Sequence, residues 1–187
     1  MKNIKFLRLV DCKESDFVQP KSMFYIQNGV EKRWDIIDAH DSVSILLYHK
    51  DLDSFVFVKQ FRPSIYLKNN DGFTYELCAG LVDKNTTLAQ IAKEEIDEEC
   101  GFDVPVESIE KITSFYTNVG VSGGCQHLYY AKINDSMKIH EGGGIHDEQI
   151  ELMYLPIEEY KEFMYDETKA KTPGLMFAFM WFMENRI

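Results

Sequence analysis

Residues 80–102 read GLVDKNTTLAQIAKEEIDEECGF and contain a helix whose two ends are marked in the sequence. Thr87 is a residue type that accepts a hydrogen bond from a free amide of the first helical turn. Gln90, three residues later, completes the pattern of a capping box. Gly101 stands where a glycine in the left-handed conformation would end the helix. The stretch therefore predicts a helix over residues 88–100.

Three glutamates of this helix lie on its apolar side. With about 100° between successive residues, Glu95, Glu98 and Glu99 overlap the arc of the apolar side chains. Carboxylates three and four residues apart repel one another, and partial burial adds a desolvation cost. A hard divalent cation bound by carboxylate oxygens would offset both costs. The alternative is a solvated acidic face on a surface helix, and helix geometry alone leaves both open.

The composition is that of a globular protein with one domain, or with one domain and a small extension. The chain has 187 residues, of which 45% are hydrophobic, so a sizeable core can form. The net charge of -11 argues against nucleic acid as the main partner. It does not exclude a small phosphorylated ligand, because a bound metal reverses the local charge.

The thiols and the apolar runs indicate a cytoplasmic protein without a membrane partner. Cys12, Cys78, Cys100 and Cys125 are widely spaced and form no Cys-x-x-Cys pair, which disfavours a zinc site or a disulfide framework. No apolar run approaches the roughly 20 residues that span a membrane. We also expect no signal peptide, because no long apolar stretch follows the first residues.

Strands and helices are predicted without regular alternation. Strands are expected at residues 42–48, 55–60, 74–78, 128–133 and 150–155, and helices at 156–165 and 174–185. The last helix is apolar nearly all round, so it should be buried in the domain or against a partner subunit. The pattern favours an α+β sandwich over a doubly wound sheet.

A β-rich segment precedes this domain. Residues 23–27 and 34–39 are candidate strands, and Asn28-Gly29 between them is a strong hairpin signal. We therefore expect an N-terminal extension over residues 1–40 and a main domain over residues 41–187.

The spacing of residues 80–102 resembles the Nudix box, Gly-x5-Glu-x7-Arg-Glu-U-x-Glu-Glu-x-Gly-U, where U is a bulky apolar residue. The spacing agrees over all 23 positions, but Thr86 and Glu94 stand where the pattern has Glu and Arg. In the family those two residues support the loop and orient the catalytic glutamates. We expect Lys93, one residue before Glu94, to supply a compensating charge.

Other segments extend the resemblance to most of the chain. Residues 58–63 (VKQFRP) and 76–80 (ELCAG) are similar to the Nudix branch that acts on ADP-ribose and nucleotide sugars. The runs ELCAGLVD and, at residues 171–174, KTPG are closer still to the animal UDP-glucose pyrophosphatases. The resemblance implies a Nudix-type α/β/α sandwich with a mixed sheet and a small β-rich N-terminal subdomain. It also implies a homodimer, to which that subdomain contributes.

The resemblance implies a metal centre on the acidic helix. Glu95, Glu98, Glu99 and the backbone carbonyl of Ala79 would hold Mg²⁺ or Mn²⁺. Glu98 and Glu99 are also candidate catalytic residues. Positioning and charge stabilisation would supply most of the catalysis.

Substrate contacts are expected from three further residues. Arg62 could bind a phosphate in bidentate fashion, with a surface arginine as the alternative. Glu76 would reach the substrate or orient Arg62, and a structural ion pair is equally open. Trp34 could stack on the base across a dimer interface, or lie in the core of a small sheet.

A late acid completes the expected site. Glu148 follows the glycine-rich residues 138–146, which read as a mobile loop that would bring this carboxylate to the bound substrate. Asp147 and Glu151 are its rivals, and a solvated loop acid is the alternative. His127 and His146 lie near the expected substrate loops but carry little weight alone.

The expected reaction is metal-dependent hydrolysis of the diphosphate bond of a nucleoside diphosphate sugar resembling UDP-glucose. The products would be a nucleoside monophosphate and a sugar phosphate. ADP-ribose is the alternative substrate. A non-catalytic nucleotide-binding protein is the alternative from another class, which Thr86 and Glu94 favour and the three glutamates oppose.

Overall fold

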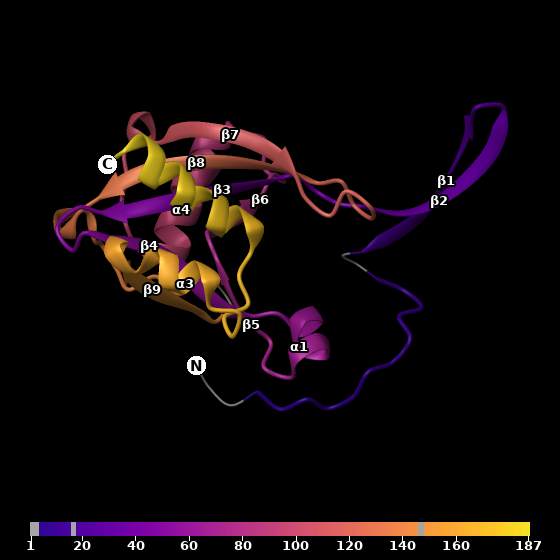
Figure 1. The fold of residues 1–187 in the computed structure, drawn as a ribbon, viewed down its shortest axis with the longest axis horizontal. Coiled ribbons are helices and arrows are strands. Elements are labelled where there is room, and N and C mark those ends of the chain that lie inside the picture. The colour runs from indigo at the N-terminus through magenta and orange to yellow at the C-terminus, as the bar shows by residue number, and fades with distance from the viewer. Residues whose placement is uncertain (1–3, 16–17, 146–147) are drawn as a thin grey trace.

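A mixed seven-stranded sheet forms the centre of the computed structural model, which describes residues 4–15, 18–145 and 148–187. Helices lie on both faces of this sheet, and a two-stranded hairpin projects from the body (Figure 1). The strands are β1 (Gln19–Gln27), β2 (Val30–Asp38), β3 (Ser42–His49), β4 (Ser54–Phe61), β5 (Phe73–Glu76), β6 (Cys78–Leu81), β7 (Glu110–Tyr116), β8 (Cys125–Ile133) and β9 (Ile150–Pro156). The α-helices are α1 (Pro63–Asn69), α2 (Leu88–Glu95), α3 (Tyr160–Tyr165) and α4 (Pro173–Asn185), and short 3₁₀ turns cover Val106–Ser108, Asp135–Met137 and Ile157–Glu159.

Strand β3 organises the sheet. It runs parallel to β8 along its whole length, while its first half pairs with β6 and its last residues pair with β4, both antiparallel. Strand β4 in turn pairs with β5 and β9. The chain thus forms the mixed sheet that the family resemblance implies.

The two faces of the sheet bury two separate hydrophobic cores. Val43, Ile45 and Leu47 of β3 face α2, and Leu46 between them faces α4. On the α4 side, the rings of Phe55 and Phe179 stack with their centroids 4.4 Å apart. Full burial of one such side chain contributes about 2 kcal/mol. The α+β sandwich is confirmed.

The acidic helix begins and ends where its capping residues predict. Thr87 Oγ1 accepts a hydrogen bond from the Gln90 amide at 3.2 Å, and Gly101 ends the segment in the left-handed conformation with φ 72°. The bond from the Gln90 amide to Thr87 is one half of the expected capping box. The Gln90 side chain, which would supply the other half, donates to Glu94 at 3.2 Å. Residues Ile96–Cys100 form a π-helical turn that continues α2, a wider turn of the kind often found at functional sites.

The hairpin signal is also confirmed. Asn28 and Gly29 have φ of 56° and 77°, the left-handed pair that a two-residue hairpin turn needs. Both faces of the hairpin are largely exposed, and backbone contact with the body includes the Ile37 amide, which donates to the Val121 carbonyl at 2.9 Å.

Two local expectations were wrong or incomplete, and two elements were not expected. Residues 74–78 are not one strand: β5 pairs with β4, and β6 pairs with β3, because the chain passes from one neighbour to the other at Leu77. Residues 156–165 are not one helix, because Pro156 ends β9, Ile157–Glu159 form a 3₁₀ turn, and α3 begins only at Tyr160. Strand β7 and helix α1 were not predicted, since α1 buries none of its residues and β7 is mostly exposed.

Among the described residues, each helix is too short or too polar to cross a bilayer.

Candidate active site

A cleft of about 510 Å³ lies where β6 faces the acidic helix, and it gathers side chains from several separate parts of the chain. They come from the start of β3, the end of β4, β5, β6 and the loop after it, α2 with its π-helical turn, β8, and the loop before β9. The predicted site residues that line it are Arg62, Glu76, Ala79, Glu95, Glu98, Glu99 and Glu148. The fold thus brings together all the predicted residues except Trp34.

Strand β6 lies directly against two of the glutamates. Glu99 is 6% exposed, and its Oε2 accepts a hydrogen bond from the Ala79 amide at 3.0 Å. Gly80 leaves space for the Glu95 side chain, because a Cβ atom there would lie 2.0 Å from Glu95 Oε1. The glycine of the box is therefore needed for a close approach of strand and carboxylate.

Burial and mutual repulsion keep these carboxylates protonated at higher pH than usual. Burial, followed by the nearby carboxylates of Glu95 and Glu148, raises the pKa of Glu99 to about 8, against the opposing effect of the Ala79 amide. Burial and the Glu98 carboxylate likewise raise the pKa of Glu95 to about 7. A bound divalent cation would offset both effects and release the protons. The donor set therefore fits a hard cation with oxygen ligands.

Arg62 and Glu76 form a two-pronged ion pair at one wall of the cleft. Arg62 Nε donates to Glu76 Oε1 at 2.8 Å, and Nη2 donates to Oε2 at 2.7 Å. Burial would raise the pKa of Glu76, but hydrogen bonds from Arg62 and Thr74 outweigh it and lower the pKa. Glu76 is thus the charged partner of Arg62, and both side chains line the cleft.

The loop before β9 carries Glu148 into the cleft. Gly142, Gly143 and Gly144 have φ of 70°, 108° and 85°, and the Gly143 amide donates to the Glu99 carbonyl at 2.8 Å. Glu148 Oε2 accepts from the Ile145 amide at 3.0 Å. The rival Glu151 lies on β9, exposed and opposite Lys59. The other rival, Asp147, and His146 lie outside the described residues.

The expectation for Lys93 was wrong. Lys93 pairs with Asp103, whereas Glu94 accepts a hydrogen bond from Lys84 Nζ at 2.8 Å. Lys84 also lines the cleft and was missed by the sequence reasoning. The signal that could have found it is a basic residue in the loop of the box, combined with an acid at position 94 of the helix.

Trp34 and His127 are not among the residues that line the acidic cleft. The Trp34 side chain is 53% exposed on β2, so it is not a core residue, and its Nε1 donates to the Gly120 carbonyl at 2.9 Å. His127 Nδ1 lies 2.9 Å from the Ser114 hydroxyl.

A larger hollow of about 720 Å³ adjoins the acidic cleft and shares Arg62, Glu76 and Gln126 with it. The KTPG segment, residues 171–174, forms part of its wall. Lys171 Nζ donates to the carbonyls of Asp166 and Lys169, so this lysine holds the loop before α4 in place. Gln126 belongs to the wall of both spaces and carried no sequence signal.

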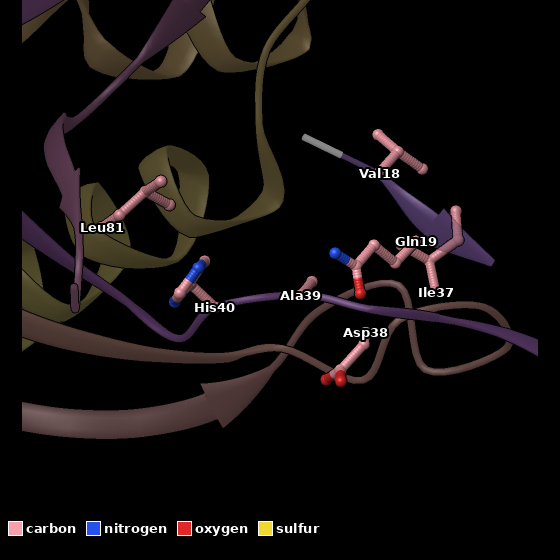
Figure 2. Close-up of a pocket in the computed structure, with 7 residues that line it drawn as sticks. All are labelled: Val18, Gln19, Ile37, Asp38, Ala39, His40 and Leu81. Carbon is pink, nitrogen blue, oxygen red and sulfur yellow. The ribbon is translucent and has the colours of Figure 1, made fainter. Parts of the chain in front are cut away.

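Two other places are poorer candidates. A hollow of about 440 Å³ at the base of the hairpin includes His40 and Asp38 (Figure 2), and the Asp38 carboxylate is already paired with Lys21. A cluster of His49, Asp51 and Asp135 has ligand atoms within 4.8 Å of one another. It lies at the opposite end of β3 from Ser42, which borders the acidic cleft.

Known proteins similar to this chain act on nucleotide sugars, although no family model matches it. The chain is 33% identical over 211 residues to the uridine diphosphate glucose pyrophosphatase NUDT14 of Bos taurus, with 97% of this chain and 95% of that protein covered. The Mus musculus protein of the same name is 30% identical over 203 residues, covering 93% and 91%. The GDP-mannose pyrophosphatase of Cronobacter sakazakii is 35% identical over 134 residues, covering 71% and 69%.

Proposed function

Because the chain belongs to the Nudix nucleotide-sugar pyrophosphatases, we propose that it hydrolyses the diphosphate bond of a nucleoside diphosphate sugar, with UDP-glucose as first candidate. The chain is a hydrolase that acts on phosphoric anhydrides. The observation that carries the proposal is the cleft in which three glutamates of the box meet Arg62 and Glu148. Water adds to one phosphorus, the bridging P–O bond breaks, and a nucleoside monophosphate and a sugar phosphate leave.

The family implies a divalent metal, and we propose Mg²⁺, or Mn²⁺ in its place, held by Glu95, Glu98, Glu99 and the Ala79 carbonyl. When bound, the cation neutralises diphosphate charge and activates a water molecule. Support comes from the raised pKa values of Glu95 and Glu99, whose protons a cation would displace.

Two residues act on the substrate and the nucleophile in this proposal. Arg62, held by Glu76 through two hydrogen bonds, binds a phosphate oxygen of the diphosphate. Glu148 accepts a proton from the attacking water, with Glu98 and Glu99 beside it in the same cleft. The adjoining hollow of about 720 Å³ is large enough to take the part of the substrate beyond the diphosphate.

We further propose that the chain forms a homodimer through the N-terminal segment over residues 1–40. Support comes from the projecting hairpin, whose exposed apolar side chains include Met23, Phe24, Ile26 and Val30. In such a dimer Trp34 would stack on the base of a substrate bound by the other subunit.

The free thiols Cys12, Cys78, Cys100 and Cys125 suit a cytoplasmic location.

The test is release of nucleoside monophosphate from UDP-glucose, GDP-mannose and ADP-ribose, each with Mg²⁺ or Mn²⁺. We expect UDP-glucose to be turned over most efficiently and Glu95→Gln to abolish turnover. The matched control is Glu107→Gln, in the exposed 3₁₀ turn before β7, which should keep full activity. Absence of turnover with all three substrates would refute the proposed function.

A further inference from the structure

The cleft contains many carboxylates and few basic side chains, so each basic side chain there has a large electrostatic effect. Of the described residues that line it, Arg62 and Lys84 are the basic ones, against five glutamates and Asp83. Arg62 is paired with Glu76 on one wall. Lys84 is therefore the basic residue on the wall formed by the box, between β6 and α2.

Lys84 joins the loop after β6 to the acidic helix. Its Nζ donates to Glu94 Oε2 at 2.8 Å, and the Gln90 side chain binds the other oxygen of the same carboxylate at 3.2 Å. Both oxygens of Glu94 are thus engaged, and its side chain has a defined orientation. The Lys84 charge also acts on Glu95 and Glu98 and partly offsets the repulsion between them.

We propose that Lys84 and Glu94 form an ion pair that positions Glu95 and Glu98 for the cation, with the positive charge on the loop and the negative charge on the helix. This inference rests on the proposed function. In the box pattern the loop residue is Glu and the helix residue is Arg, whereas here Thr86 is neutral and Glu94 is acidic. The pair therefore has the opposite polarity, and Lys84 takes the place of a helix arginine as the positive partner.

The loop and helix that the pair joins are those that shape the metal site. Glu95 follows Glu94 directly, and its carboxylate lies over Gly80, four residues before Lys84. If the pair is broken, Glu94 keeps its negative charge beside Glu95 and Glu98 without a basic partner, and the loop loses its side-chain bond to the helix. Lys84 is a positioning residue in this scheme, because its ammonium is bound to Glu94.

The size of the effect follows from the exposure of the pair. The side chains of Lys84 and Glu94 are 44% and 34% exposed. Partly exposed pairs contribute at most about fivefold in an equilibrium or rate constant. A charge reversal at one partner adds like-charge repulsion, so we expect a loss of about tenfold.

The test is a charge-exchange cycle with Lys84→Glu, Glu94→Lys and the double variant, read by Mn²⁺ titration in electron paramagnetic resonance and by kcat. Each single variant should bind Mn²⁺ about tenfold more weakly and lower kcat by a similar factor, with KM for UDP-glucose little changed. The double variant should return both quantities to within about twofold of the wild type. The neutral variants Lys84→Met and Glu94→Gln should each lose about fivefold, and their combination should lose no more than either.

The matched control is the ion pair between Lys93 on the same helix and Asp103, which follows the end of the helix, exchanged by Lys93→Glu and Asp103→Lys. Its single variants should leave Mn²⁺ affinity unchanged. If Lys84 acted only as a nearby positive charge, Lys84→Glu would bind Mn²⁺ more tightly than the wild type, which would overturn the proposal. An equal loss in the Lys93 variants, or a double variant no better than the product of its singles, would also overturn it. Wild-type protein without any turnover would refute the proposed function, while the Mn²⁺ titration would still decide on the pair.

Discussion

Gly80→Ala tests how closely β6 approaches the Glu95 carboxylate. A Cβ atom at Gly80 would lie 2.0 Å from Glu95 Oε1 and 2.1 Å from its Cδ. Ordinary contact begins at 3.4 Å, so the separation must grow by about 1.4 Å. The nearest atoms belong to the flexible Glu95 side chain, and Gly80 is not left-handed, so the carboxylate moves while the backbone stays.

The displacement is large for a catalytic group and small for the fold. A misplacement of about 1 Å costs about a hundredfold in rate, so kcat should fall by about that factor. Replacing glycine by alanine where the backbone allows it changes stability by less than about 1 kcal/mol. For a chain of this size that corresponds to a shift of about 3 °C in Tm.

The assay measures kcat at saturating Mg²⁺ and UDP-glucose, beside a thermal melt of the same preparation. Gly120→Ala is the control, because a Cβ atom there meets nothing within 4 Å and the residue is not left-handed. It should keep both kcat and Tm. A Gly80→Ala protein with normal Tm and kcat within twofold of the wild type would refute the reasoning about Glu95.

Three more predictions concern single residues of the cleft. The metal-free protein should lose stability in urea as pH rises from 5 to 9. The pKa of Glu99 is raised from 4.5 to about 8 in the folded chain, so folding takes up a proton at pH values between these two. The stabilisation from this proton uptake is lost as the pH rises through the folded-state pKa. Glu99→Gln should flatten that dependence and lower kcat by orders of magnitude; an unchanged slope would contradict the assigned burial effect. Arg62→Lys should raise KM for UDP-glucose about tenfold, since a single ammonium cannot replace the two-pronged guanidinium, and steady-state kinetics with unchanged KM would contradict a phosphate contact. Glu148→Gln should lower kcat by about 10² to 10³ at pH 8 without changing the fold; near-normal turnover would exclude Glu148 as the proton acceptor.

Local features were predictable from the sequence because they depend on residues near one another in the chain. The helical segment 88–100 has its cap at Thr87 and its end at Gly101, as the residue types indicate. The hairpin turns at Asn28-Gly29 because both residues accept the left-handed conformation. Helix spacing also placed the three glutamates on the apolar side, and Glu99 is buried as that predicts.

Elements that bury little apolar surface were harder to predict. Helix α1 buries none of its residues, so it carries no apolar periodicity that sequence reasoning could find. The division of residues 73–81 into β5 and β6 depends on which strands lie beside them, and no local pattern records that choice.

The sequence by itself determined the acidic helix, its caps and the spacing of its carboxylates, since backbone geometry over a few turns requires nothing from the rest of the chain. Only the tertiary structure decided which charges meet. It placed Lys84, not Lys93, beside Glu94, and Arg62 beside Glu76. Such pairs join segments that are 10 to 14 residues apart, and their formation depends on how strand, loop and helix pack.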